Sequence, residues 1–196
     1  ITLVTNELNL GFVATCNRAM QLHAERDVVL LNSDTIVGDG WLDRMVACAA
    51  VTPQTASVTP FSNNATLCSY PRLAISNELS SSTPLRALDA MFATVNAGCS
   101  VEIPTGVGFC MLLTRVAIDA IGMFDVEAFG RGYGEENDWC MRATAQGFTH
   151  RLCGDVFVYH KGEVSFGIDA SARKQHAQAV IDARYPAYHE LIARHL

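Results

Sequence analysis

Apolar residues alternate along the chain with charged and turn-forming residues in a way that predicts alternating strands and helices. The pattern predicts a strand over 1–6 (ITLVTN), a helix over 14–26, a strand over 27–34 (DVVLLNSD) and a helix from about Leu42 to Ala50. A β-α-β-α order favours a parallel sheet with helices on its faces. We therefore expect an α/β fold with a mostly parallel sheet flanked by helices.

The middle of the chain is less regular, because residues 59–71 are polar and turn-rich and residues 76–84 are rich in Ser and Thr. A long irregular segment inside a compact domain is usually functional or mobile. Regular patterns then resume. They predict a helix over 85–95, a buried strand within 102–115, a helix ending at Gly122, an acidic helix beginning near Glu135, a last strand within 150–162 and a polar helix over 169–183.

The overall composition describes an ordinary globular protein. With 196 residues, 49% of them hydrophobic, the chain fits a single domain (1–196), of which 168–196 form a C-terminal helical extension. The net charge of −6 without a Lys/Arg cluster argues against nucleic acid as a partner and against a polybasic membrane anchor. The longest apolar stretches, such as 107–114, are too short to cross a bilayer.

Seven cysteines at irregular spacing, with no CxxC pair, predict buried free thiols in a reducing compartment, with the cytoplasm as the default. A zinc site built from them is improbable. Because the chain opens directly on a predicted strand, we also expect that an N-terminal part of the domain is missing from this sequence.

Acidic residues stand at two positions where chemistry is expected. Asn32, Ser33 and Asp34 follow a buried strand, and ligands of open α/β sheets bind beyond the carboxyl ends of strands. Glu135 and Glu136, together with Asp138, begin the acidic helix. These three acids could simply offset the helix dipole, and Asp138 could pair with Arg142 four residues later. Crowding, however, raises carboxyl pKa values toward the range of a general base.

His160 and Thr105 are further polar residues predicted near strand ends, which suggests one pocket shared with Asp34. Imidazole and carboxylate together suit Mn²⁺ better than Ca²⁺. One carboxylate is enough for Mn²⁺ or Mg²⁺ if a diphosphate supplies further oxygens. Trp139 is either a core residue, the safer interpretation, or a platform for a sugar ring.

Five stretches taken together resemble the family-2 glycosyltransferases, which have the GT-A fold and use nucleotide-diphospho-sugars. They cover roughly residues 6–167 in the family's order, and bacterial rhamnosyl-type enzymes of surface-polysaccharide assembly are the most similar branch. The stretches are NLGFVATCNRAM, LLNSDTIVGDGWLDRM, PTGVGFCMLLTR, IGMFDVEAFGRGYGEENDWCMRA and VYHKGEVSFG.

The resemblance assigns roles to individual residues. It implies Asp34 and His160 as ligands of Mn²⁺ or Mg²⁺, and Glu136 as the catalytic base with Glu135 as the second choice. It also implies donor contacts by Asn32, Ser33, Asp34, Thr105 and Gly106, and acceptor contacts by Trp139 and Tyr133. Two departures are evident: Asn32 stands where the family has an Asp, and nothing matches the family's first strand.

The resemblance implies an inverting, metal-dependent glycosyltransferase that moves a sugar from a nucleotide-diphospho-sugar to a hydroxyl of a glycan or lipid-linked glycan. We expect it in the cytoplasm or at the inner face of the membrane, with peripheral association through the rest of the native chain. Two alternatives remain open. One is a nucleotidyltransferase acting on nucleotide sugars, and the other is a non-catalytic sugar- or nucleotide-binding domain of a larger assembly enzyme.

Overall fold

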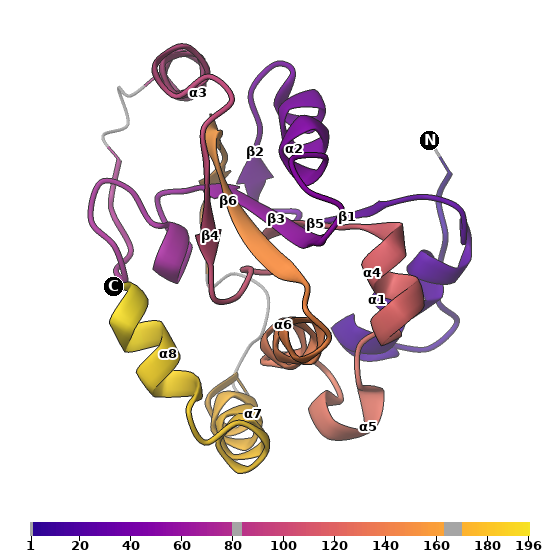
Figure 1. The fold of residues 1–196 in the computed structure, drawn as a ribbon. Coiled ribbons are helices and arrows are strands. Elements are labelled where there is room, and N and C mark those ends of the chain that lie inside the picture. Colours follow the sequence, from indigo (N-terminus) through magenta and orange to yellow (C-terminus); the bar gives the residue numbers. More distant parts are fainter. Residues whose placement is uncertain (1, 80–83, 163–169) are drawn as a thin grey trace.

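The computed structural model describes residues 2–79, 84–162 and 170–196, in which helices cover both faces of a central sheet (Figure 1). The five-stranded sheet has the order β1 (Val28–Leu31), β5 (Cys110–Leu113), β3 (Thr55–Phe61), β6 (Thr149–Phe157) and β4 (Ser100–Ile103). A separate pair joins β2 (Thr35–Ile36) to β7 (Tyr159–His160). The helices are α1 (Gly11–Gln21), α2 (Trp41–Ala49), η1 (Thr66–Cys68), α3 (Leu85–Val95), α4 (Arg115–Ile121), α5 (Val126–Phe129), α6 (Glu135–Ala145), α7 (Ala170–Arg184) and α8 (Tyr188–His195).

The α/β class with a sheet flanked by helices is confirmed, and the sheet is mixed. Strands β1, β3 and β6 run in one direction, as the β-α-β-α pattern predicts. Strands β4 and β5 run in the opposite direction, so β3 and β6 are the only parallel neighbours among the described strands. The carboxyl ends of β1 and β6 therefore lie at the same edge as the beginning of β5. The loop before β5 is thereby brought to the edge where ligands are expected.

Two hydrophobic cores lie on the two faces of the sheet. Helices α2 and α3 cover one face, and α4 and α6 cover the other (Figure 1). Alternate residues of β5 enter alternate cores: Met111 packs with Trp139, whereas Leu112 packs with Met45. All four β5 side chains are buried, which explains why this strand has a continuous apolar sequence.

Several predicted boundaries were wrong. Residues 2–6 form no strand, while residue 1 lies outside the described part of the chain. Helix α1 begins at Gly11 and ends at Gln21, earlier than the predicted 14–26. The edge strand β4 was missed because its two middle residues are exposed and its sequence SVEI is short. Residues 80–83 of the irregular middle and residue 169 of the last predicted helix lie outside the described residues.

The central strand β3 was also missed, because its sequence TASVTPF looks polar. Its polar side chains are buried and hydrogen-bonded: Ser57 Oγ lies 2.8 Å from His150 Nδ1, and Val107 N donates to Thr59 Oγ1 at 3.2 Å. Pro60, which cannot donate to the ladder, stands where the pairing with β6 shifts register. Polar residues can therefore occupy the middle of this sheet at little cost in free energy, because their side chains keep hydrogen-bond partners.

Several predicted elements agree with the structure. Helices α2, α3, α4 and α6 and strand β5 lie where the pattern placed them, and α7 and α8 are the last two helices of the chain. All seven cysteines are free thiols, and five of them are buried. Within the described residues, no helix is long and apolar enough to span a membrane.

Candidate active site

The short ladder of β2 and β7 brings Asp34 and His160 together. Thr35 pairs with His160, and Lys161 N donates to the Asp34 carbonyl at 3.1 Å. The Asp34 carboxylate accepts a bond from Gly162 N at 3.1 Å, and its Oδ2 lies 3.6 Å from His160 Nε2. Both side chains are largely shielded from solvent. Backbone pairing thus holds a carboxylate and an imidazole at one point of the sheet edge.

Two asparagines after β3 fix the orientation of His160. The side chain of Asn63 accepts from His160 N and donates to the His160 carbonyl, at 2.8 and 2.9 Å. The Asn64 carbonyl lies 2.8 Å from His160 Nδ1, so Nδ1 must carry the proton. In the neutral ring, Nε2 then presents its lone pair toward Asp34 and toward the Asn32 amide, 3.5 Å away.

This arrangement fits a divalent cation. A separation of 3.6 Å between Oδ2 and Nε2 is too long for a hydrogen bond but suits two ligands at about 2.1 Å from one ion. An imidazole whose other nitrogen donates to a carbonyl is the usual state of a metal-bound histidine. The described residues contain no group of three or more acidic, His or Cys side chains that could hold an ion. Further ligands would therefore have to come from a substrate or water.

The loop before β5 joins this pair to the acidic helix α6. Phe109 stacks its ring on that of His160, with centroids 5.0 Å apart, and its carbonyl accepts from Asn32 N at 2.8 Å. The preceding Gly108 lies against Glu136, since a Cβ added there would meet Glu136 Cδ at 3.7 Å. Of two consecutive residues, Phe109 thus contacts the possible metal ligand His160, and Gly108 lies near the predicted base Glu136.

The two glutamates of α6 have different surroundings. Glu135 is 5% exposed, and burial together with the adjacent Glu136 carboxylate raises its pKa well above the usual range. Glu135 also faces Cys16 on α1, because its charge helps to raise the pKa of that thiol. Glu136 instead lines a cavity, and burial raises its pKa as well. Glu136 is therefore the carboxyl group that an external molecule can reach.

The cavity beside Glu136 has a volume of about 340 Å³, within the range of small-ligand pockets. Thr105 and Gly106 line it, and Thr105 Oγ1 donates to Asn137 Oδ1 at 3.2 Å. Gly106 N donates to the buried sulfur of Cys140 at 3.3 Å, which ties the loop to α6. Thr105 thus lies in the same cavity as Glu136. Its connection to Asp34 and His160 runs through later residues of the same loop, such as Phe109.

The structure separates the other predicted site residues from this cavity. Trp139 is 1% exposed and donates its Nε1 proton to the Gly122 carbonyl at 2.8 Å, so it is a core residue and the sugar-platform alternative is wrong. Asp138 is fully buried and pairs with Arg142 at 2.8 Å, as its spacing suggested. Ser33 is exposed beside Asp34.

Tyr133 lies in the turn before α6 at an unusual φ of +76°, with Lys174 Nζ 5.2 Å from its ring centroid. The neighbouring Gly134 has a φ of +81°, and a Cβ there would lie 3.1 Å from Ala177 Cβ on α7. The turn therefore packs closely against α7. An acceptor contact by Tyr133 stays a prediction.

The sequence interpretation missed residues that complete the site. Asn63 and Asn64 occur in a run that had no assigned role, although two amides directly after a strand are a signal of side-chain bonds to backbone. Tyr188 of α8 lines the cavity with Glu136 although it is far from it in sequence. No local pattern marks such a contact.

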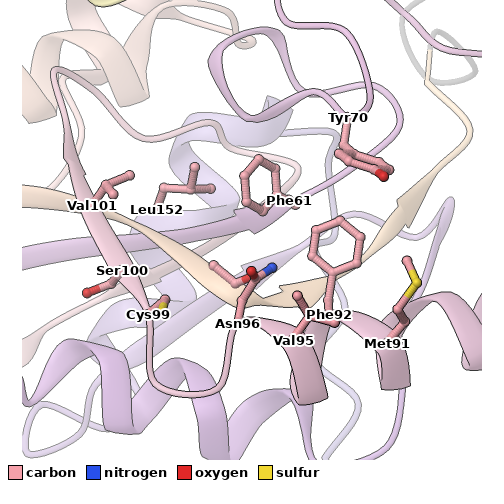
Figure 2. Close-up of a pocket in the computed structure, with 11 residues that line it drawn as sticks. Phe61, Tyr70, Met91, Phe92, Val95, Asn96, Cys99, Ser100, Val101 and Leu152 are labelled. Carbon is pink, nitrogen blue, oxygen red and sulfur yellow. The ribbon is translucent and has the colours of Figure 1, made fainter.

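A larger cavity of about 440 Å³ lies between α3 and the β4–β6 edge of the sheet (Figure 2). The aromatic rings of Phe61, Tyr70 and Phe92 gather on it, with Phe92 and Tyr70 centroids 5.0 Å apart. Among the described residues, its lining includes no Asp, Glu or His and none of the predicted site residues. Its titratable groups are the Tyr70 phenol and the Cys99 thiol.

Comparisons with known proteins agree with this architecture. No curated protein matches the sequence significantly. Among 52 matching chains of known structure is the crystal structure of GalNAc-T7 with UDP, GalNAc and Mn²⁺, with a TM-score of 0.60 and 14% identity. The match covers 95% of this chain but only 37% of that one. The sequence profile described as "Glycosyltransferase like family 2" matches residues 1–180. The chain therefore belongs to the glycosyltransferase-like family 2.

Proposed function

We propose that this chain is an inverting, metal-dependent glycosyltransferase. It moves a sugar from a nucleotide-diphospho-sugar to a hydroxyl of a glycan or lipid-linked glycan. The observation that carries the proposal is the loop before β5, where a Cβ added at Gly108 would lie 3.7 Å from Glu136 Cδ and where Phe109 stacks on His160. A base and a pair of possible metal ligands on opposite sides of one loop are what sugar transfer from a diphosphate requires.

Each residue has a defined task in this reaction. Glu136, whose Oε2 is buried without a hydrogen-bond partner, accepts the proton of the acceptor hydroxyl as that oxygen attacks the anomeric carbon. Its raised pKa makes it a stronger base than a solvated carboxylate. Asp34 and His160 would hold Mn²⁺ or Mg²⁺, and the ion would supply positive charge for the departing diphosphate. Asn32 and Ser33, with Thr105 and Gly106, contact the donor.

The choice of first probes follows from the structural neighbour and the sequence resemblance. The neighbour was crystallised with UDP, GalNAc and Mn²⁺, which makes UDP-sugars with Mn²⁺ the first donors to test. The resemblance to rhamnosyl-type enzymes adds deoxyhexose donors. It also supports a role in cell-surface polysaccharide assembly at the cytoplasmic face of the membrane.

The test is a transfer assay with a panel of nucleotide sugars and glycan acceptors in Mn²⁺, in which the released nucleoside diphosphate is measured. Glu136→Gln should lower the rate by about 10²–10⁴-fold, while the affinity for UDP and Mn²⁺ stays unchanged. Glu127→Gln, an exposed acid on α5, serves as the matched control. Undiminished turnover in Glu136→Gln would overturn the assignment of the base.

The same assay separates the alternatives. Release of pyrophosphate from a nucleoside triphosphate and a sugar phosphate would indicate a nucleotidyltransferase. Binding of UDP without turnover by any donor would indicate a non-catalytic binding domain. Either result would replace the proposal.

A further inference from the structure

Helix α8 forms part of the cavity that contains Glu136. Tyr188, His189 and Ile192 line it from one side, and Glu136 and Asn137 line it from α6. Leu67, Ala74, Val107 and Leu196 complete the apolar part of the lining among the described residues. The family profile ends at residue 180, so α8 lies beyond the part of the chain that matches it. The helix therefore lines the cavity beside Glu136 from outside the residues that the profile matches.

A buried network holds α8 in this position. Asp138 of α6 is fully buried and accepts bonds from Arg184 Nη1 and Tyr185 Oη, both at 2.8 Å. Arg184 also bonds to Asp125 at 2.8 Å. These residues end α7 and lead directly into α8, whose first residue donates its backbone N–H to the Tyr185 carbonyl. Because Asp138 and Glu136 stand on the same helix, the network fixes α8 relative to the base.

Tyr188 connects α8 to the loop that lines the cavity. Its side chain is 8% exposed and belongs to the core that contains Trp139. It lines the cavity together with Thr105 and Glu136. Burial, together with the Glu136 carboxylate, raises the pKa of Tyr188. Thr105 in turn bonds to Asn137, next to the base.

We propose that α8 forms the acceptor-binding wall of the active site, with Ile192 as an acceptor contact and Tyr188 as the residue that positions Thr105 beside Glu136. The inference rests on the proposed function and extends it to the acceptor. The apolar surface of Tyr188 and Ile192 faces polar groups of α6 across the cavity. This combination suits a saccharide whose apolar ring face lies on α8 while one hydroxyl meets Glu136.

Substitutions on α8 test the wall directly in the full chain. Ile192→Ala enlarges the cavity on the acceptor side, and Tyr188→Phe removes one hydroxyl with little change of shape. Leu191→Ala is the matched control, because Leu191 is the adjacent residue, is 37% exposed and does not line the cavity. Each variant is assayed for the KM of acceptor and donor, for donor hydrolysis without acceptor, and for UDP affinity.

Ile192→Ala should raise the acceptor KM at least about 5-fold and leave donor hydrolysis and UDP affinity unchanged. Tyr188→Phe should lower kcat with the same acceptor, again without loss of UDP affinity. Leu191→Ala should behave as the unsubstituted chain. If Ile192 and Tyr188 had only a structural role, their substitution would loosen the packing around both sites. The acceptor KM and the UDP affinity would then change together.

Equal effects of Ile192→Ala and Leu191→Ala on the acceptor KM would overturn the proposed wall, and so would parallel losses of UDP and acceptor affinity. Failure of the proposed function gives a different result. In that case the unsubstituted chain transfers no sugar, or Glu136→Gln transfers it undiminished. A third result refutes only the inference about α8. In it, the unsubstituted chain transfers sugar, Glu136→Gln does not, and the α8 variants behave as the unsubstituted chain.

Discussion

His160 donates its Nδ1 proton to the backbone carbonyl of Asn64 across 2.8 Å. The bond fixes the tautomer, so that the neutral ring directs the lone pair of Nε2 toward Asp34. A carboxylate next to an imidazole often accepts a proton from it, but here the proton is on the opposite nitrogen. The Nε2 lone pair and the Asp34 carboxylate then point to the same place, as the proposed metal role requires.

Asn63→Ala should weaken Mn²⁺ binding by about 10–100-fold, because the Asn63 side chain bonds to both the N–H and the carbonyl of His160. Isothermal titration of Mn²⁺ in the presence of UDP measures the change. Asn96→Ala is the control, since its side chain also bonds to a backbone carbonyl, that of Gly154 on the remote cavity. Unchanged Mn²⁺ affinity in Asn63→Ala would show that the amide does not orient the ligand.

Asp34→Asn should reduce the affinity for UDP in Mn²⁺ to the level found in EDTA, because the site then loses the carboxylate that lies 3.6 Å from His160 Nε2. Titration of UDP with and without metal gives the two affinities. The exposed Asp39→Asn controls for loss of a nearby charge. If the Asp34→Asn variant still bound UDP more tightly with Mn²⁺ than without it, the ion would have to bind at other residues.

Glu135→Gln should stabilise the fold at high pH. The pKa of Glu135 is raised in the folded chain, so its contribution to stability is complete below the unfolded pKa and is lost as the pH rises through the folded pKa. A neutral amide avoids this loss. We expect a gain of at least about 1 kcal/mol at pH 8, or about 2–4 °C in Tm, and no gain near pH 4.

Thermal unfolding across this pH range measures the change in Tm caused by Glu135→Gln. The control is Glu127→Gln at an exposed residue, which shows how Tm changes when an exposed acid is lost. A difference between Glu135→Gln and the unsubstituted chain that is independent of pH would contradict the raised pKa.

Asp138→Ala should destabilise the domain by about 3–5 kcal/mol, because two arginines and a tyrosine lose a buried partner. Asp119→Ala is the matched control. Its carboxylate pairs with Arg115 at 3.7 Å and is 65% exposed, so we expect a loss of about 0–1 kcal/mol. Urea unfolding gives both values, and equal losses would mean that the buried network contributes little.

The sequence predicted those parts of the fold and site that depend on local pattern. Strand β1 with Asp34 at its end, helix α6 with its leading acids, and His160 beyond β6 all follow from short stretches of chain. Membership of the glycosyltransferase family was predicted from several such stretches in order. The metal and catalytic roles of these residues stay predictions until the experiments above are done.

What the sequence did not predict depends on contacts between distant segments. Strand β3 looks polar because its Ser57 and Thr59 find partners on β6 and in the loop before β5. Trp139 beside the acidic cluster resembles a sugar platform, but helical geometry turns it into the core while Glu136 faces the cavity. The position of Tyr188 results from the Asp138 network, and no periodicity in α8 encodes it.

The β2–β7 ladder sets the backbone spacing of Asp34 and His160, and Asn63, Asn64 and Phe109 orient His160 within it. Insertions elsewhere between α2 and β6 leave this pairing in place. The lining of the cavity can therefore vary while Asp34 and His160 stay in register. Under the proposed function, a change of sugar or acceptor requires changes in the loops and in α8 but none in this pair.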